Sequence, residues 1–208
     1  MKLLTLLTGL LFACQSYAQD AGQVLVFLNS KPNKMDLPVN EQEALQKAHM
    51  QNINRLVEDG KLIVAGPFDG GGGIFIFNSS KVSEVKALLA SDPAVRANRW
   101  QIEMYPLHYL KGGACAPKKP YEMVSYHFIR VHFINDIANY KMNNNTSDVW
   151  QYLQEHSSLL VAGVFPQHDG GFIIYQGEQI ENWFGEGQDD MISLVHKTLW
   201  VAKGSFCE

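Results

Sequence analysis

Leu62-Ile-Val-Ala-Gly-Pro-Phe68 is repeated 97 positions later as Leu159-Leu-Val-Ala-Gly-Val-Phe165, and glycines and a short aromatic and aliphatic run follow each copy. A repeat of this period is too long for a solenoid unit and has the length of a small domain. The repeat therefore predicts two similar domains in one chain. It also provides an internal control, because a residue found in only one copy is not needed for the fold.

The composition is that of an ordinary globular protein. The 208 residues are 46% hydrophobic and 18% charged, and the formal net charge is -4. Lysine and arginine are scattered, so no basic cluster indicates nucleic-acid binding and no basic amphipathic stripe indicates a membrane surface. We therefore expect no nucleic-acid partner.

The N-terminus has the pattern of a cleavable secretory signal. Lys2 precedes an apolar run over residues 3–12, and Ser16-Tyr-Ala18 has the small-x-small pattern of a cleavage site. The run is too short for a transmembrane helix, which needs about 20 apolar residues. We expect residues 1–18 to be a signal peptide cleaved after Ala18, and the protein to be secreted or periplasmic. The alternative is a lipoprotein that carries its lipid on Cys14.

Beyond that segment the chain has two cysteines, Cys115 and Cys207. In an oxidising compartment they could pair, or they could remain free thiols in flexible segments, and the sequence leaves both possibilities open. The chain has no CxxC or CxxH spacing, and the histidines of its second half lack a shared ligand spacing. We expect no metal site.

The first copy has the residue pattern of a β-α-β-β-α-β unit. Short β-branched and aromatic runs predict strands at 24–28, 62–65, 74–77 and 100–105. Helical spacing predicts one helix between Asn40, which stands three residues before Glu43 as in a capping box, and Gly60. A second helix is predicted around 82–89. This order defines the ferredoxin-like unit.

A linker over 111–120 and a second copy over 121–208 are expected to follow the first domain, 22–110. The second copy is predicted to have a helix that begins at Thr146 or Ser147, broken helical pieces at 180–184 and 191–195, and strands at 126–133, 159–162, 172–175 and 198–202. A sheet with helices on one face leaves its other face uncovered. We therefore predict an α+β fold in which the two repeats pack as an intramolecular pseudo-dimer. The alternative is a homo-oligomer in which each copy pairs with another chain.

The first copy resembles the YCII-related family. The matching segments keep the same order and spacing and lie at 29–33, 49–56, 60–68 and 91–95. The resemblance spans about residues 24–109 and is much weaker from Tyr121 onward. It implies a dimeric α/β-barrel arrangement of ferredoxin-like units and a histidine–aspartate site, here His49 and Asp92. It also implies proton transfer of the lyase or isomerase type on a small organic molecule, without a cofactor.

His49 is the candidate general acid or base. It lies four residues after Leu45 and four before Ile53, so it faces the apolar stripe of the predicted helix. Imidazole suits proton transfer at neutral pH, and a carboxylate such as Asp92 could orient the ring and stabilise its charged form. The alternative is a core histidine that bonds a backbone carbonyl.

Asp92 also fits a helix N-cap, because Pro93 follows it. A shift of 97 positions places Asp92 on Asp189 and His49 on Thr146, so the aspartate persists where the histidine does not. Capping is therefore the main expected role of Asp92, and catalysis would be a second use.

Four further residues are expected to bind substrate. Gly66, Pro67 and Phe68 end the repeated strand, and Asp36 lies in the loop before the helix. The glycines at 70–73 predict a hairpin loop and not a phosphate site, because neither a helix N-terminus nor a lysine follows them.

The tryptophans Trp150, Trp183 and Trp200 are expected in the core or at the interface between the sheets. The contrasting function is a non-catalytic binding or structural module of the cell envelope, in which His49 is an ordinary core residue.

Overall fold

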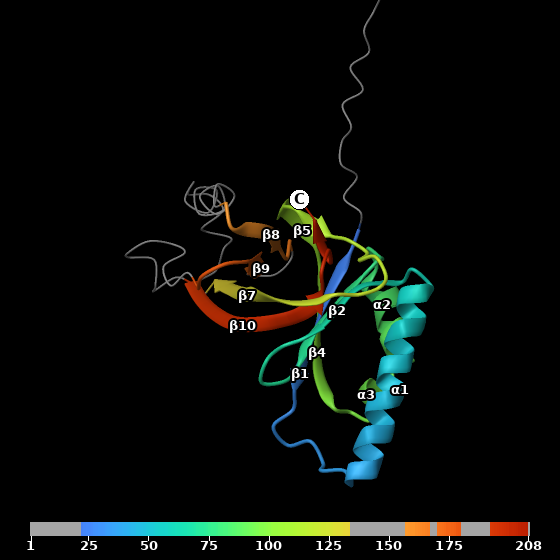
Figure 1. The fold of residues 1–208 in the computed structure, drawn as a ribbon. Coiled ribbons are helices and arrows are strands. Elements are labelled where there is room, and N and C mark those ends of the chain that lie inside the picture. Colours follow the sequence, from blue (N-terminus) through green and yellow to red (C-terminus); the bar gives the residue numbers. More distant parts are fainter. Residues whose placement is uncertain (1–21, 134–156, 167–169, 180–191, 208) are drawn as a thin grey trace, which may run out of the picture.

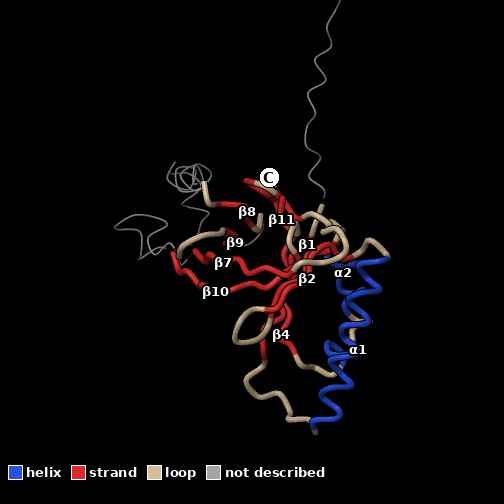
Figure 2. Tube along the Cα trace, in the orientation of Figure 1, coloured by secondary structure: helices blue, strands red, loops and turns tan. Residues whose placement is uncertain are grey.

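The computed structural model describes residues 22–133, 157–166, 170–179 and 192–207. Figure 1 and Figure 2 show two sheets packed against each other, with the helices on the outer side of the first sheet. The first sheet has the order β2-β3-β1-β4. Its strands are β1 (Val24–Ser30), β2 (Leu62–Pro67), β3 (Gly73–Phe77) and β4 (Trp100–Pro106). The helices are α1 (Val39–Glu58), α2 (Val82–Leu89) and α3 (Pro93–Arg96). The predicted α+β fold with a ferredoxin-like first unit is confirmed.

The start of α1 differs from the prediction. Asn40 does not cap this helix, because α1 begins at Val39 and the N-cap residue is Pro38, which makes no side-chain capping bond. The Pro38 carbonyl instead accepts hydrogen bonds from the backbone N–H groups of Glu41 and Gln42. The predicted stop is confirmed, because Gly60 follows the end of α1 with a positive φ of 65° that suits glycine.

The second sheet repeats the topology of the first. Its order is β10-β7-β9-β8-β5, and its first four strands correspond to β4-β1-β3-β2. The strands are β5 (His108–Lys111), β7 (Met123–Phe133), β8 (Leu159–Val164), β9 (Gly170–Tyr175) and β10 (Ile192–Ala202). The register shifts between Leu62 and Val64 in β2 and again between Leu159 and Val161 in β8. The repeated sequence therefore forms the same bulged strand twice.

The prediction of a helical piece at 191–195 is wrong. β10 pairs with β7 without interruption from Ile192 to Ala202, so residues 192–195 belong to a strand. Ile192 and Leu194 alternate with polar Ser193, which is a strand period and not a helical one. The helix predicted from Thr146 and the piece at 180–184 lie outside the described residues.

The segment between the two sheets contains two short strands in addition to connecting chain. β5 extends the second sheet by pairing with β8. β6 (Gly113–Ala114) pairs with β11 (Phe206–Cys207) near the C-terminus. The segment predicted as a linker at 111–120 is therefore partly paired with the last residues of the chain.

The two sheets share one hydrophobic core inside a single chain. The ring of Phe27 on β1 lies 5.9 Å from that of Phe128 on β7, measured between centroids. The buried members of this core come from both sheets and the segments next to them: Leu25, Phe27, Val64, Ile74, Ile76, Leu107, Phe128, Val161, Phe165, Phe172, Ile174, Leu199, Val201 and Phe206. The predicted intramolecular packing of the two repeats is thus confirmed.

Phe27 and Arg130 occupy equivalent positions in the two sheets. Phe27 pairs with Ile74 in β3, and Arg130 pairs with Phe172 in β9. Ile74 and Phe172 in turn face Gly66 and Gly163, the repeated glycines. The two equivalent side chains also contact each other, since the Arg130 guanidinium lies 4.2 Å from the centre of the Phe27 ring. This cation–π contact joins the two sheets.

Glu103 on β4 completes this contact with an ion pair. Its carboxylate accepts a hydrogen bond of 2.6 Å from Nη2 of Arg130 and another of 2.6 Å from the hydroxyl of Tyr105. The hydrogen bond from Arg130 has the largest effect on the pKa of Glu103 and lowers it. Burial raises this pKa, but the hydrogen bonds from Arg130, Tyr105 and Asn29 outweigh that effect, so the pKa of Glu103 falls from 4.5 to about 2. Glu103 therefore stays charged between the sheets.

Gly66 lies where the edges of the two sheets meet. A β-carbon built on Gly66 would lie 2.3 Å from Cγ1 of Val201 and 2.9 Å from the backbone oxygen of Trp200, both on β10. The repeated glycine is therefore required in the first copy because the backbone of the second copy passes against it. Its equivalent Gly163 meets the Phe172 ring instead.

We expect Gly66→Ala to lower the free energy of unfolding by about 1 to 3 kcal/mol, because the added methyl group forces β2 and β10 apart. Gly113→Ala is the matched control, since a β-carbon there meets nothing within 4 Å. Urea denaturation of both variants measures the difference. Equal stabilities would contradict the close approach of the two sheets at Gly66.

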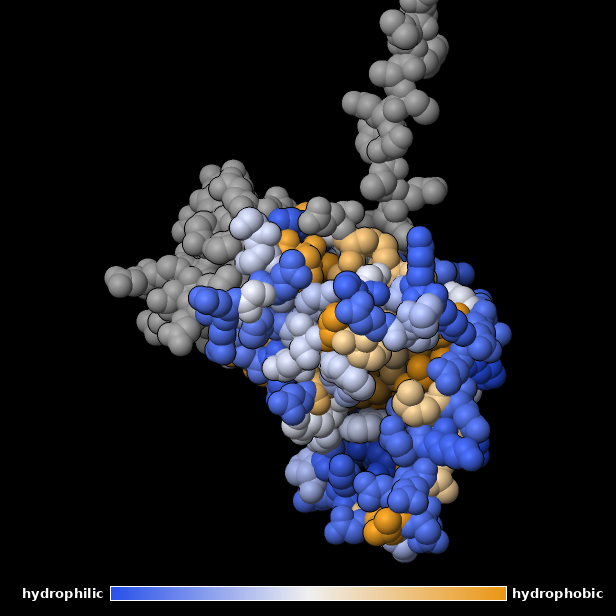
Figure 3. All heavy atoms as spheres, in the orientation of Figure 1, coloured by the Kyte–Doolittle hydropathy of each residue, from blue (hydrophilic) through white to orange (hydrophobic). Residues whose placement is uncertain are grey.

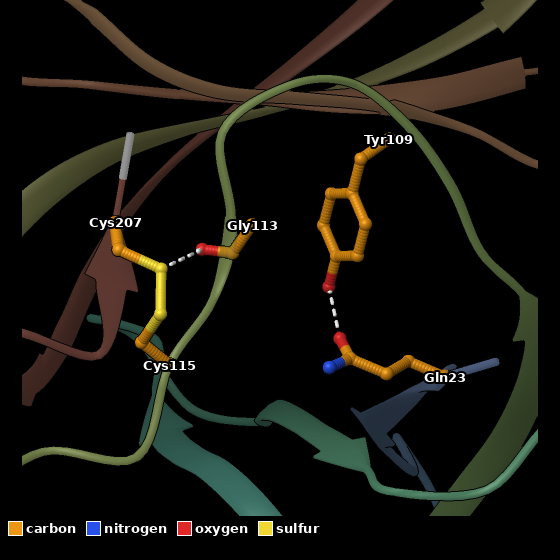
Figure 4. Close-up of a disulfide and its surroundings, with 5 residues drawn as sticks. All are labelled: Gln23, Tyr109, Gly113, Cys115 and Cys207. Carbon is orange, nitrogen blue, oxygen red and sulfur yellow. Dashed lines mark hydrogen bonds between the residues drawn. A yellow bond between two sulfur atoms is a disulfide. The ribbon is translucent and has the colours of Figure 1, made fainter. Parts of the chain in front are cut away.

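Cys115 and Cys207 form a disulfide (Figure 4), with a separation of 92 residues along the chain. Of the two possibilities that the sequence leaves open, the structure has the paired one. Beside the disulfide, the Tyr109 hydroxyl on β5 donates a hydrogen bond of 2.5 Å to the Gln23 side chain, just before β1. The connecting segment is therefore held to both sheets. Among the described helices, none has the length and apolar character needed to cross a membrane.

Candidate functional site

His49 lies on the buried face of α1. The residues that α1 buries include His49, Ile53 and Leu56, which follow the spacing of one helical face. The His49 ring stacks on Phe75 of β3, with centroids 6.1 Å apart and planes inclined by 24°. The helix and the first sheet thus hold the imidazole in a fixed orientation.

The side-chain partner of His49 is Asp92. Nδ1 of His49 lies 2.9 Å from Oδ1 and 2.8 Å from Oδ2 of this carboxylate. His49 is 7% exposed and Asp92 is 1% exposed. The alternative of a core histidine bonded to a backbone carbonyl is therefore not what the structure contains.

Asp92 also caps α3. Its Oδ1 accepts hydrogen bonds from the backbone N–H groups of Ala94, at 2.8 Å, and Val95, at 3.2 Å. Pro93 occupies the first turn of α3, so the predicted capping role is confirmed. One carboxylate therefore fixes the first turn of α3 and orients the imidazole of α1.

The hydrogen bonds of Asp92 keep its carboxylate ionised despite its burial. Burial alone raises the pKa of Asp92. The hydrogen bond and charge of His49, the N–H of Val95 and the amide of Asn52 act in the opposite direction, and the net pKa lies below the usual value of 3.8. The His49 imidazole therefore faces an anion.

Asn52, Arg55 and Ser91 extend the pair into a network that was not predicted from the sequence. Asn52 Nδ2 donates to Asp92 Oδ2 at 3.1 Å, and its Oδ1 accepts from Arg55 Nη2 at 2.8 Å and from Ser91 Oγ at 3.1 Å. One sequence pattern could have indicated this network. His49, Asn52 and Arg55 follow one another at intervals of three residues, which places them close together on one helix. The network therefore holds Oδ2 of Asp92, whereas the cap of α3 uses Oδ1.

A cavity of about 450 Å³ opens beside His49. His49, Gly66 and Pro67 are among the residues that line it, whereas Asp92 is not. The carboxylate therefore lies behind the imidazole as seen from the cavity. With Nδ1 bonded to Asp92, Nε2 is the ring nitrogen that remains for a ligand, since none of the described residues forms a hydrogen bond with it.

Two of the predicted substrate-binding residues lie elsewhere. Phe68 is partly buried against the shared core, with its ring 5.1 Å from that of Phe128, and it forms a β-bridge with Leu199. Asp36 is exposed in the loop before α1 and does not line the cavity. The predicted hairpin glycines do contribute, because 71–73 are part of the cavity wall.

Trp200, which was expected in the core or at the interface between the sheets, does not lie in the core. It is 50% exposed and lines the cavity. Its strand neighbours Leu199 and Val201 turn into the shared core, and residues alternate between the two faces of a strand, so Trp200 faces outward. Trp150 and Trp183 lie outside the described residues. In the described parts of the chain, no three His, Cys, Asp or Glu residues are grouped as a metal site would need.

The fold and the buried pair define the first half of the chain as a ferredoxin-like domain with one histidine–aspartate pair beside a cavity. The model of the YCII-related domain family matches residues 22–106, a range that contains β1 to β4, His49 and Asp92, and this part of the chain is a YCII-related domain. No curated protein matches the chain. One similar solved structure, named "Putative monooxygenase" and from Fusobacterium nucleatum subsp. nucleatum ATCC 25586, has a TM-score of 0.48 and 9% sequence identity over 90% of this chain and 96% of that chain.

Proposed function

We propose that the YCII-related domain transfers a proton to or from a small organic molecule, with His49 as the general acid or base. The observation that carries this proposal is that one edge of the buried imidazole is held by Asp92 while the ring lines a cavity. The cavity has a volume within the range of small-molecule sites. The reaction class is that of a lyase or an isomerase.

The chemistry follows from the two ring nitrogens. Nδ1–H donates to Asp92, which leaves the Nε2 lone pair to accept a proton from the bound molecule. The imidazolium that forms is stabilised by the Asp92 carboxylate, and Nε2–H can then return the proton to the same or another atom. The chain's own residues carry this step: His49 moves the proton, and Asp92 holds the tautomer.

A location outside the cytoplasm is part of the same proposal. The signal-like pattern over 1–18 supports it, and the Cys115–Cys207 disulfide adds a second argument because such bonds persist in oxidising compartments. Secretion and release into the periplasm are both compatible with these features, and so is a lipid anchor on Cys14.

The proposal predicts that a ligand of the cavity exchanges a carbon-bound proton with solvent. Compounds that raise the melting temperature of the protein are first selected by thermal shift and then incubated with it in D₂O. We expect ¹H NMR to show deuterium entering the bound compound about 10² to 10⁴ times faster with the wild type than with His49→Asn. Asn54→Ala, a change at another lining residue on α1, is the matched control and keeps the imidazole.

Two results would overturn this function. The first is exchange at the same rate in wild type and His49→Asn. The second is a set of ligands that stabilise wild type and His49→Asn equally and show no exchange in either, which would establish a binding module in which the histidine has no part.

A further inference from the structure

The cavity beside His49 is closed by both halves of the chain. Met123 on β7 and Trp200 on β10 come from the second sheet. Pro117 and Tyr121 come from the connecting segment, which the Cys115–Cys207 disulfide ties to the C-terminal strand β11. The YCII-related domain alone therefore provides only part of the wall, although it contains the histidine.

Trp200 is unusual for the strand that carries it. Its neighbours Leu199 and Val201 are both 0% exposed, whereas Trp200 is 50% exposed and lines the cavity. Met50, Tyr121 and Met123 are also exposed and line the same cavity. Figure 3 shows apolar side chains gathered on this face of the molecule, between α1 and the second sheet. Large apolar side chains grouped at a cavity indicate a binding surface.

Apart from His49, which is charged only when it is protonated, the cavity wall contains no charged side chain among the described residues. Its polar side chains apart from His49 include Gln46, Asn54 and Ser205, all of which are neutral. A phosphate or carboxylate ligand would need an arginine, a lysine or a helix N-terminus as a partner. The wall instead contains four aromatic residues, Phe75, Trp100, Tyr121 and Trp200, and flat apolar molecules pack well against aromatic faces.

We infer that the second half of the chain provides the surface that binds the ligand on which His49 of the first half acts. We further infer that this ligand is an uncharged, planar ring compound packed against Trp200. This inference rests on the proposed function for the role of His49, and it adds the substrate class and a specificity-determining residue. A charged substituent would lose its water on entering this wall and find no opposite charge there.

A matched pair of fluorescent probes tests the inference on the full-length oxidised protein. N-phenyl-1-naphthylamine is an uncharged ring compound, and 8-anilinonaphthalene-1-sulfonate has the same ring system with one added sulfonate. We expect the uncharged probe to bind about tenfold more tightly than the sulfonate. We also expect Trp200→Ala to weaken its binding about tenfold and Trp200→Phe to restore most of the affinity. Equal affinity for the two probes would overturn the inferred ligand class.

Val195→Ala is the matched control for Trp200→Ala. Val195 is an exposed apolar residue on the same strand, 40% exposed, and it lies outside the cavity wall. The Val195→Ala substitution should leave the affinity for N-phenyl-1-naphthylamine unchanged. An equal loss in both variants, or no loss with Trp200→Ala, would overturn the role of Trp200. These results are separate from the proton exchange at His49, because the probes report binding only and His49→Asn leaves the aromatic wall intact.

Discussion

Replacing Asp92 with alanine is expected to lower the free energy of unfolding by about 3 to 5 kcal/mol. The change removes the cap of α3 and leaves the buried groups of His49 and Asn52 without their acceptor. Unpaired buried polar groups are costly because water cannot replace the missing partner. Urea denaturation at neutral pH measures the loss.

Asp92→Asn separates the two roles of this carboxylate. Asparagine keeps an oxygen for capping but lacks the charge beside His49, so we expect a smaller loss of stability than with alanine. Asp59→Ala is the control, because within the described residues the Asp59 side chain forms only an exposed ion pair with Arg55, and its loss should change stability by less than about 1 kcal/mol. Losses of equal size for Asp92→Ala and Asp59→Ala would contradict the network.

The contribution of Asp92 should also depend on pH in one direction. Its pKa in the folded protein lies below the usual 3.8, so folding favours the ionised form. This stability is fully present above pH 3.8 and is lost as the pH falls through the lowered pKa. The difference in free energy of unfolding between wild type and Asp92→Asn should therefore shrink as the pH falls. A difference that grows in acid would show that folding raises the pKa of Asp92 instead of lowering it.

Removing the Cys115–Cys207 disulfide is expected to lower the free energy of unfolding by about 4 to 5 kcal/mol. The bond closes a loop of 92 residues, and a cross-link over a long loop restricts the unfolded chain strongly. The double variant Cys115→Ser with Cys207→Ser should show this loss in urea denaturation.

Wild type with its disulfide reduced is the matched comparison for the double variant. The two should unfold at the same urea concentration, because both lack only the cross-link. A double variant as stable as the oxidised wild type would show that the bond does not restrain the fold.

Much of the fold followed from the repeated strand. Residues 62–65 and 159–162 were predicted as strands from their apolar character, and a duplicated unit with one open sheet face predicted the shared core. The predictions that were wrong concern features that depend on contacts between distant segments. The start of β10 at Ile192 depends on its pairing with β7, and the two-residue strand at 113–114 depends on its pairing with Phe206 and Cys207. Local patterns do not contain such pairings.

The candidate site was predictable where helix geometry decides the outcome. The spacing of His49 on the apolar face of α1 and the Asp92-Pro93 capping pattern each indicated one side chain of the pair. Asp36 and Phe68 were placed at the site by proximity in sequence to other motifs, and the folded chain carries them away from it. Trp200 was missed as a cavity residue because its strand passes the first domain only after the two sheets pack together.

The contact between Phe27 and Arg130 shows what joining two copies in one chain makes possible. In a symmetric dimer of identical subunits, equivalent residues that meet each other must be the same residue, so an arginine there would face an arginine. Covalent linkage removes that identity requirement. The two halves of this chain differ at this contact and complement each other, with a cation on one side and an aromatic ring and Glu103 on the other. Neither half would make this contact with a second copy of itself.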